Sequence, residues 1–421
     1  MQTLEAHRAI EAVWRIESAR LIAGLTRIVH DVGRAEELAQ DALVAALEQW
    51  PATGVPDNPG AWLMTTARNR SIDALRRRET LERKVQELGR ELDTVQEPDL
   101  AAEIDDHVGD DLLRLVFIAC HPVLGTEARV ALTLRLLGAL TTDEIARAFL
   151  VPKATVAQRV VRAKKTLADA QVPFELPAPE QLEARLTSVL EVIYLVFNEG
   201  YSATAGEDWI RPELCEEALR LGRIVAELMP EEPEVHGLAA LMELQASRLR
   251  ARVGPAGEAV LLPDQDRARW DRLLIGRGLV ALERARRLAR PAGPYVLQAE
   301  IAACHARALT AEQTDWVRIA ALYAALAQRM GSPVIELNRA VALGMALGPA
   351  AGLELVDELR DEPALADYHL LSSVRGDLLE KLGRRAEARA EFERAASMTR
   401  NARERELLRG RAAACETGAV R

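Results

Sequence analysis

Residues 141–167 read TTDEIARAFLVPKATVAQRVVRAKKTL, and this stretch predicts two short helices joined by a tight turn. Thr142 is a suitable N-cap for the first helix, because its hydroxyl can accept a hydrogen bond from the free N–H groups of the next turn. Proline disfavours helical geometry at the residue before it, so Val151-Pro152 ends this helix, and Pro152 or Lys153 begins the second. The stretch therefore predicts a helix-turn-helix.

The second helix of this motif has one apolar face and one basic face. Its apolar residues recur at spacings of four, three and four, and would pack on the first helix. The basic face suits a helix that lies against phosphates and base edges in the major groove of DNA, although a solvated surface helix has the same pattern. The apolar residues are Val156, Val160, Ala163 and Leu167, and the basic ones are Lys153, Arg159, Arg162, Lys164 and Lys165.

The turn between the two helices has an unusual residue. Such turns often place glycine just before the position of Val151, because glycine reaches positive φ without strain, and this chain has Leu150 there. We therefore expect the turn either to follow a different path or to be strained.

Length and composition indicate an all-helical protein of two or three domains. The chain has 421 residues, more than one ordinary domain holds. Aromatic residues make up only 4%, and segments rich in Val, Thr and Tyr are scarce. The net charge of −10 argues against a protein that coats nucleic acid indiscriminately. Any contact with DNA must therefore come from local basic patches.

The cysteines and the apolar segments indicate a cytoplasmic protein. Four widely spaced cysteines include no Cys-x-x-Cys pair, and we expect them to be reduced core thiols. We expect no signal peptide and no membrane span, since no apolar run approaches the roughly 18 residues required. Cys120-His121 lacks further ligands for a metal site, and no nucleophile elbow or phosphate loop is present. We therefore expect no metal, no cofactor and no enzymatic activity.

The N-terminal 50 residues predict two helices. The pattern of apolar residues breaks at His30-Asp31-Val32-Gly33, and AEELAQDALVAALEQW then begins the second helix. This second helix has an acidic face, which serves either solubility or the binding of a partner. The residues expected to face inward are Leu38, Ala42, Ala45 and Leu47, and those expected to be exposed are Glu36, Glu37 and Asp41.

A proline-rich loop and an arginine-rich helix follow. Residues 51–59, PATGVPDNP, predict the loop, and a helix then runs from Gly60 to about Arg78. This helix combines Trp62 with several arginines. Rings that stack on bases and guanidinium groups that pair with phosphates suit melted nucleic acid. A core tryptophan beside a basic helix end is the alternative interpretation.

Three segments in this order are typical of a known family. They are GRAEELAQDALVAALEQW, then NPGAWLMTTARNRSIDALRRR, then the helix-turn-helix. Together they resemble the two conserved domains of extracytoplasmic-function sigma factors of bacterial RNA polymerase. The resemblance implies that the acidic helix binds the β′ clamp helices of core polymerase. It also implies that the arginine-rich helix reads the −10 promoter element, while the helix-turn-helix reads the −35 element.

Carried over to this chain, the resemblance implies three groups of contact residues. The core-polymerase group is Asp31, Glu37 and Asp41. The −10 group is Asp57, Asn58, Trp62, Arg68, Asn69, Asp73, Arg76 and Arg77, and residues 52–58 would form a pocket for a flipped base. The −35 group is Lys153, Thr155, Gln158, Arg159, Arg162 and Lys165.

The long C-terminal extension predicts further amphipathic helices. Between residues 368 and 400, small and large residues follow the spacing of a tetratricopeptide repeat, so we expect a helical solenoid of this type. The chain thus resembles the sigma-factor subgroup with such an extension. The turn after Asn198-Glu199 is expected to be a helix end rather than a catalytic site. The predicted domains are 1–80 (sigma domain 2), 81–111 (acidic linker), 112–170 (sigma domain 4), 171–179 (proline-rich hinge) and 180–421 (extension).

Two functions stay open at this point. The first is an alternative sigma factor whose extension either inhibits the sigma domains or is required for their activity. The second is a tetratricopeptide sensor, with a protein or peptide ligand, that binds duplex DNA as a conventional regulator. The helix from Gly60 to Arg78 favours the first, because a duplex-binding protein does not need it.

Overall fold

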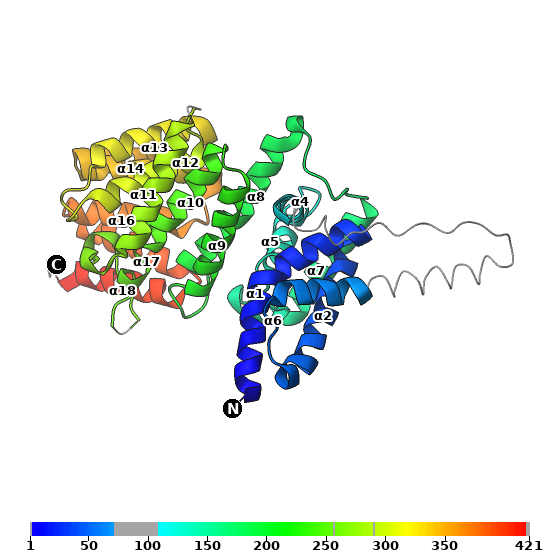
Figure 1. The fold of residues 1–421 in the computed structure, drawn as a ribbon. Coiled ribbons are helices and arrows are strands. Elements are labelled where there is room, and N and C mark those ends of the chain that lie inside the picture. Colours follow the sequence, from blue (N-terminus) through cyan, green and yellow to red (C-terminus); the bar gives the residue numbers. More distant parts are fainter. Residues whose placement is uncertain (1, 71–107, 256, 289–290, 418–421) are drawn as a thin grey trace, which may run out of the picture. The chain divides into compact units, whose positions relative to one another are not determined.

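The computed structural model describes residues 2–70, 108–255, 257–288 and 291–417, and every regular element among them is a helix (Figure 1). This confirms the predicted all-α class. The chain forms two compact units, Met1–Val192 and Ile193–Arg421. None of the helices within these described ranges is long and apolar enough to cross a membrane.

The first unit begins with two long helices, α1 (Gln2–Val29) and α2 (Val32–Thr53). They are separated at the predicted break, where His30 has φ of 53° and the side chain of Asp31 caps α2 by accepting a hydrogen bond from Arg34 N at 2.7 Å. Helix α2 continues through Pro51, so the loop expected over 51–59 is confined to residues 54–58. Residues 59–70 are again helical.

Four further helices of the first unit follow after the undescribed stretch. They are α4 (Val108–Ala119), α5 (Thr126–Leu136), α6 (Thr142–Ala148) and α7 (Lys153–Asp169). Helices α6 and α7 form the predicted helix-turn-helix, and α5 packs against both of them. The expected apolar stripe of α7 is buried. Residues 108–111, assigned to the linker from the sequence, instead form the first turn of α4, and the rest of that linker lies outside the described residues.

The turn between α6 and α7 holds Leu150 in a left-handed conformation, with φ of 50°. The expected strain is therefore present, since a side chain in this region costs about 1 kcal/mol or more. The N-cap of α6 is Thr141 rather than Thr142. Its hydroxyl accepts a hydrogen bond from Glu144 N, while the Glu144 carboxylate accepts one from Thr141 N, so the two residues form a capping box.

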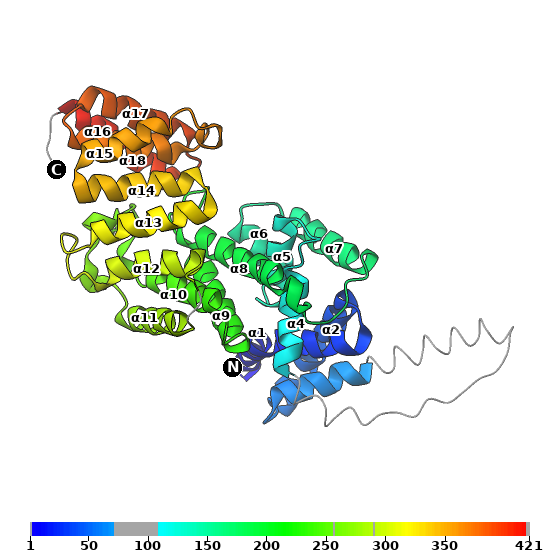
Figure 2. The same cartoon turned by 90° about the horizontal axis from the view of Figure 1, so that it is seen from above.

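The second unit is a succession of antiparallel helices, and the C-terminal half of α8 belongs to it. Each helix from α12 onward packs against the next one in the chain, and Figure 2 shows α12, α13 and α14 side by side in this order. Several helices begin with proline, which lacks the N–H that a first turn leaves unpaired. The helices are α8 (Pro179–Tyr201), α9 (Pro212–Leu228), α10 (Pro233–Ala246), α11 (Arg272–Arg287), α12 (Pro294–Arg307), α13 (Trp316–Met330), α14 (Pro333–Leu347), α15 (Pro349–Glu358), α16 (His369–Lys381), α17 (Arg385–Met398) and α18 (Ala402–Thr417).

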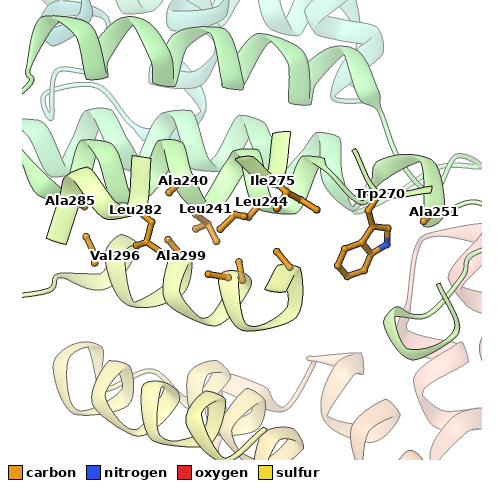
Figure 3. Close-up of a cluster of buried hydrophobic side chains, with 13 residues drawn as sticks. Ala240, Leu241, Leu244, Ala251, Trp270, Ile275, Leu282, Ala285, Val296 and Ala299 are labelled. Carbon is orange, nitrogen blue, oxygen red and sulfur yellow. The ribbon is translucent and has the colours of Figure 1, made fainter. Parts of the chain in front are cut away.

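Buried side chains of this unit form two large clusters, and two smaller ones join α12, α13 and α14. One large cluster joins α10, α11 and α12, and Trp270 lies at one end of it near Ala251 (Figure 3). The other large cluster joins α14 to α18. In the second cluster, a Cβ atom on Gly376 of α16 would lie 2.7 Å from the ring of Phe392 on α17, so only glycine allows this approach. This is the small-and-large packing expected from the sequence, whereas the tetratricopeptide assignment stays a prediction.

The segment after Asn198 is tied to the C-terminal helices. Helix α8 continues to Tyr201, and the following loop contains Ala203 and Asp208. The Asn401 side-chain amide donates hydrogen bonds to the carbonyl oxygens of Ala203 and Asp208, at 3.0 and 2.9 Å. These bonds join residues about 200 positions apart, so the second unit closes its first loop against its last helices.

Candidate nucleic-acid interface

The acidic face of α2 is built by the helical period. Asp31, Glu37 and Asp41 are exposed, while Ala42 and Ala45, which were expected to face inward, are buried. Leu47 was also expected inside but is 38% exposed. The structure thus keeps all three predicted polymerase contacts at the surface, and their role stays a prediction.

Glu36 was expected to be exposed, and this is wrong. Its side chain is only 5% exposed, and its Oε1 lies 2.6 Å from Arg135 Nε of α5. The other carboxylate oxygen pairs with Lys164 Nζ of α7. Glu36 follows Val32 by four residues and precedes Ala39 by three, so the helical period places it on the buried face. Its two cationic partners explain why a carboxylate is tolerated there.

The helix from residue 59 carries part of the predicted −10 group. Trp62 is half-buried and packs edge-to-face on the buried Trp50, with ring centroids 5.3 Å apart. Asn58 caps the helix, since its Oδ1 accepts a hydrogen bond from Ala61 N at 3.1 Å. The tryptophan is therefore anchored in the packing of the first unit rather than fully free to stack on a base.

The remaining −10 residues divide between the surface and the undescribed stretch. Asp57 and Asn69 are exposed and Arg68 is half-buried. Residues 52 and 53, expected in the flipped-base pocket, belong to α2 instead. Asp73, Arg76 and Arg77 lie outside the described residues.

Helix α7 carries the predicted −35 group on its outer side. Lys153, Gln158, Arg162 and Lys165 are exposed, and Thr155 is half-buried. Arg159 differs from these, because its guanidinium pairs with Glu127 of α5 at 2.5 Å and its side chain is 26% exposed. Fewer basic side chains of α7 are therefore available to contact DNA than the sequence indicates.

The described cysteines and histidines of this unit are not grouped as metal ligands. Burial raises the pKa of Cys120 to about 11, and its Sγ lies 3.3 Å from Thr133 Oγ1. Burial, followed by the charge of Arg185, lowers the pKa of His121 to about 4. Across the described ranges no three His, Cys, Asp or Glu side chains are grouped to hold a metal ion, and all four cysteines are free and buried.

Sequence reasoning missed the attachment of α8 to the helix-turn-helix domain. Arg185 donates a hydrogen bond to the carbonyl oxygen of Phe117 at 2.9 Å, and Ser188 Oγ donates one to that of Cys120 at 2.6 Å. Arg129 of α5 in turn donates to Ser188 Oγ and lies 3.3 Å from Glu191. The boundary between the two units therefore falls inside α8 rather than at the proline-rich segment. The apolar spacing of α8 gave no sign of which domain it would cover.

Family models match three parts of the chain. Residues 16–80 match sigma-70 region 2, and residues 114–167 match sigma-70 region 4. Residues 185–286 match a family of unknown function, DUF6596. The sigma-70 regions belong to a non-enzymatic family, and they imply binding to core RNA polymerase and promoter DNA. No solved structure matches the chain significantly.

Similar proteins fall into two groups. The "ECF RNA polymerase sigma factor SigK" of Mycobacterium sp. (strain KMS) is 27% identical over 163 residues, which are 36% of this chain and 77% of that protein. The "Probable ECF RNA polymerase sigma factor SigI" of Mycobacterium tuberculosis (strain CDC 1551 / Oshkosh) is 24% identical over 183 residues, which are 43% of this chain and 62% of that protein. These two relatives are distant and cover only part of the chain.

A much nearer relative covers both units. The "Uncharacterized protein R00370" of Rhizobium meliloti (strain 1021) is 46% identical over 391 residues, which are 92% of this chain and 91% of that protein. The chain therefore belongs to the family of this Rhizobium protein, and it carries sigma-70 region 2 and region 4 domains followed by a DUF6596 domain.

Proposed function

We propose that this protein is an alternative sigma factor that binds core RNA polymerase and directs promoter-specific transcription initiation in the cytoplasm. The observation that carries the proposal is the pair of surfaces in the first unit. The exposed acidic residues of α2 lie in the region 2 domain, and the exposed basic residues of α7 lie in the region 4 domain. Neither surface alone requires polymerase, whereas a sigma factor needs both.

The acidic surface of α2 would contact the β′ clamp helices. Asp31 at the N-cap of α2 reaches solvent, as do Glu37 and Asp41 within the helix, and buried residues fill the opposite face. Such a helix can dock without repacking its own core. Exposed carboxylates at the rim of an interface steer association and select the partner through charge complementarity.

The two DNA-facing surfaces would read separate promoter elements. Residues 57–69 would contact the −10 element, where Trp62 and Arg68 supply an aromatic ring and a cation for melted DNA. The exposed face of α7 would enter the major groove at the −35 element, with Arg162 and Lys165 near bases or phosphates.

This function requires the two sigma domains to separate. Promoter elements centred about 25 base pairs apart lie about 85 Å apart along B-DNA, at 3.4 Å per base pair. In this structure Glu36 of the region 2 domain is in ion-pair contact with Arg135 and Lys164 of the region 4 domain. We therefore propose that these contacts hold a resting arrangement and break when the protein joins polymerase at a promoter.

The test of the function is reconstitution with core RNA polymerase. The purified protein should comigrate with core enzyme on gel filtration and direct transcripts from a distinct set of promoters. A protein that binds duplex promoter DNA but neither comigrates with core enzyme nor changes its transcripts would be a conventional regulator, and the proposal would then fail.

A further inference from the structure

The second unit contains a cation–aromatic cluster, formed by Arg248, Arg252 and Arg267 with Tyr201 and Trp270. Arg248 and Arg267 are each only 8% exposed. The Arg252 guanidinium carbon lies 3.8 Å from the Tyr201 ring centre, and that of Arg267 lies 4.7 Å from the Trp270 ring centre. The guanidinium carbon of Arg248 lies 5.7 Å from the ring centre of Tyr201 and 5.8 Å from that of Trp270. Three positive charges therefore meet in the interior of this unit.

The three arginines differ in how their N–H groups are satisfied. Arg267 donates to the carbonyl oxygens of His305 and Ala308, at 2.7 and 2.8 Å, and to Thr314 Oγ1 at 3.1 Å. Hydrogen bonds within the chain therefore hold the guanidinium of Arg267 in place. By contrast, Nε of Arg248 and Nε of Arg252 are both buried without a hydrogen-bond acceptor. Two guanidinium groups therefore have donor capacity that the chain does not use.

Neighbouring indole groups add to the surplus of donors. Nε1 of Trp270 and Nε1 of Trp209 are buried without an acceptor. Trp270 is 3% exposed, and the Trp209 ring centre lies 5.4 Å from the Arg252 guanidinium. Buried N–H groups are normally paired, so several unpaired donors in one place indicate a missing acceptor.

The Glu312 carboxylate acts on Arg267, where it opposes the lowering of the arginine pKa by burial. No carboxylate in the described part of the chain forms an ion pair with Arg248 or Arg252. Burial raises the pKa of Tyr323 to about 12 and also raises that of Tyr194, so both neighbouring phenols are neutral at physiological pH. Burial and the charges of Arg248 and Arg267 lower the pKa of His305 to about 3, which leaves this imidazole neutral.

Buried cations without a counter-ion are costly, because desolvation is not offset by an opposite charge. Burial lowers the pKa of Arg252, and the nearby charge of Arg248 lowers it further. Cation–π contacts with Tyr201 and Trp270 recover part of this cost but leave Nε of Arg248 and Nε of Arg252 unpaired. An oxyanion between the guanidinium groups would supply both the charge and the acceptors, since guanidinium binds carboxylate and phosphate through paired hydrogen bonds.

We propose that the cation–aromatic cluster is a binding site for a small organic anion. Its carboxylate or phosphate group would lie between Arg248 and Arg252, and its body would contact the rings of Tyr201 and Trp270. Arg267 would contribute charge from its fixed position. The site lies within the part of the chain that matches DUF6596, apart from the neighbouring groups of α12 and α13, and it would make the second unit a sensor of an acidic metabolite.

The test is a titration of the full-length protein with two probes, inorganic phosphate and benzoate, against chloride at matched ionic strength. We expect at least one probe to bind, with an affinity that falls at least ten-fold in Arg248→Gln and in Arg252→Gln. The matched control is Arg277→Gln, which removes an exposed arginine of α11 and should leave the affinity unchanged. The absence of binding by both probes, or equal binding by all variants, would overturn the proposal.

A second variant guards against loss of folding in the arginine variants. Trp270→Phe retains an aromatic ring but removes the indole N–H. It should lower the affinity for the probe and leave the circular dichroism spectrum unchanged. The probe should also change tryptophan fluorescence in the wild type more than in Trp270→Phe. An equal fluorescence change and equal affinity in both proteins would exclude binding at this cluster.

Discussion

Arg135 Nε lies 2.6 Å from Glu36 Oε1, and this ion pair joins the region 4 domain to the region 2 domain. Lys164 pairs with the second oxygen of the same carboxylate, so one buried residue of α2 holds both α5 and α7. A second ion pair joins α1 to α4, where Nε of Arg27 lies 2.9 Å from Oδ2 of the buried Asp111. The contact between the sigma domains therefore includes buried ion pairs, and an electrostatic competitor such as DNA can weaken these pairs.

Replacing Glu36 with Gln should destabilise the first unit. The change leaves Arg135 and Lys164 without their shared counter-charge, and each of these side chains is only 22% exposed. Losing one partner of a buried ion pair costs roughly 3 to 5 kcal/mol, and we expect about 2 kcal/mol here because both cations reach solvent. Urea unfolding followed by tryptophan fluorescence measures the change.

The matched control for this prediction is Glu37→Gln. Glu37 is the neighbouring carboxylate and is exposed, so its replacement should change the free energy of unfolding by less than about 0.5 kcal/mol. Equal effects of the two substitutions would mean that the Glu36 ion pairs contribute no stability.

Reversing the charge of α2 should weaken the complex with core polymerase. Asp41→Lys reverses one of these charges but also places a lysine beside Arg70, which donates a hydrogen bond to the Asp41 carbonyl oxygen at 2.5 Å and lies 4.0 Å from the Asp41 carboxylate. Glu37→Lys reverses a charge on the same helix and leaves the contact between Asp41 and Arg70 in place. Both variants should retain wild-type helix content and show reduced comigration with core enzyme. Retained comigration of both variants would remove α2 from the polymerase interface.

Within α7, Arg162 should contribute more than Arg159 to binding of the −35 duplex. Arg162 is exposed, whereas Arg159 is held by Glu127 at 2.5 Å. We expect Arg162→Ala to cost about 1 to 3 kcal/mol in binding, measured by fluorescence anisotropy on labelled duplex. Glu127→Gln frees Arg159 and removes a negative charge near DNA, so it should strengthen binding. If Arg159→Ala proves the more costly change, the Glu127 pair must open on DNA.

Local patterns predicted the helices, but they could not supply the contacts between distant segments. The spacing of Val156, Val160 and Ala163 identified the buried face of α7, because a helical period is a short-range property. The helical period places Glu36 on the buried face of α2, but a buried carboxylate needs a cationic partner, and no local pattern shows that this partner is Arg135, 99 residues away. The hydrogen bonds that Arg185 and Ser188 of α8 form with residues of the helix-turn-helix domain were missed for the same reason.

Replacing Leu150 with glycine should stabilise the helix-turn-helix. Leu150 holds φ of 50° and is 54% exposed, so glycine relieves strain at the loss of few contacts. The left-handed conformation costs a non-glycine residue about 1 kcal/mol, part of which glycine's greater freedom in the unfolded chain cancels. We expect the free energy of unfolding, measured by thermal unfolding, to rise by about 0.5 to 1 kcal/mol. Leu150→Ala keeps the strain, and a gain as large as that of glycine would show that strain is not the cause.

Two truncations should separate the structural role of α8 from the functional role of the second unit. A chain ending at Pro177 loses Arg185 and Ser188, which bind the carbonyl oxygens of Phe117 and Cys120. It also loses the buried side chain of Leu186. A chain ending at Val192 retains all of these contacts. We therefore expect the shorter chain to melt at a lower temperature than the longer one, measured by circular dichroism.

Promoter-specific transcription by the chain ending at Val192 then tests the second unit. A tethered inhibitor works at an effective concentration in the millimolar range, so it needs a release device. A thiol switch is not available for this, since the four cysteines are free and buried. We therefore expect the second unit to be required, and activity with core enzyme to fall at least ten-fold while the truncated unit stays folded. Increased activity would instead identify the second unit as an inhibitor, and unchanged activity would give it no part in initiation.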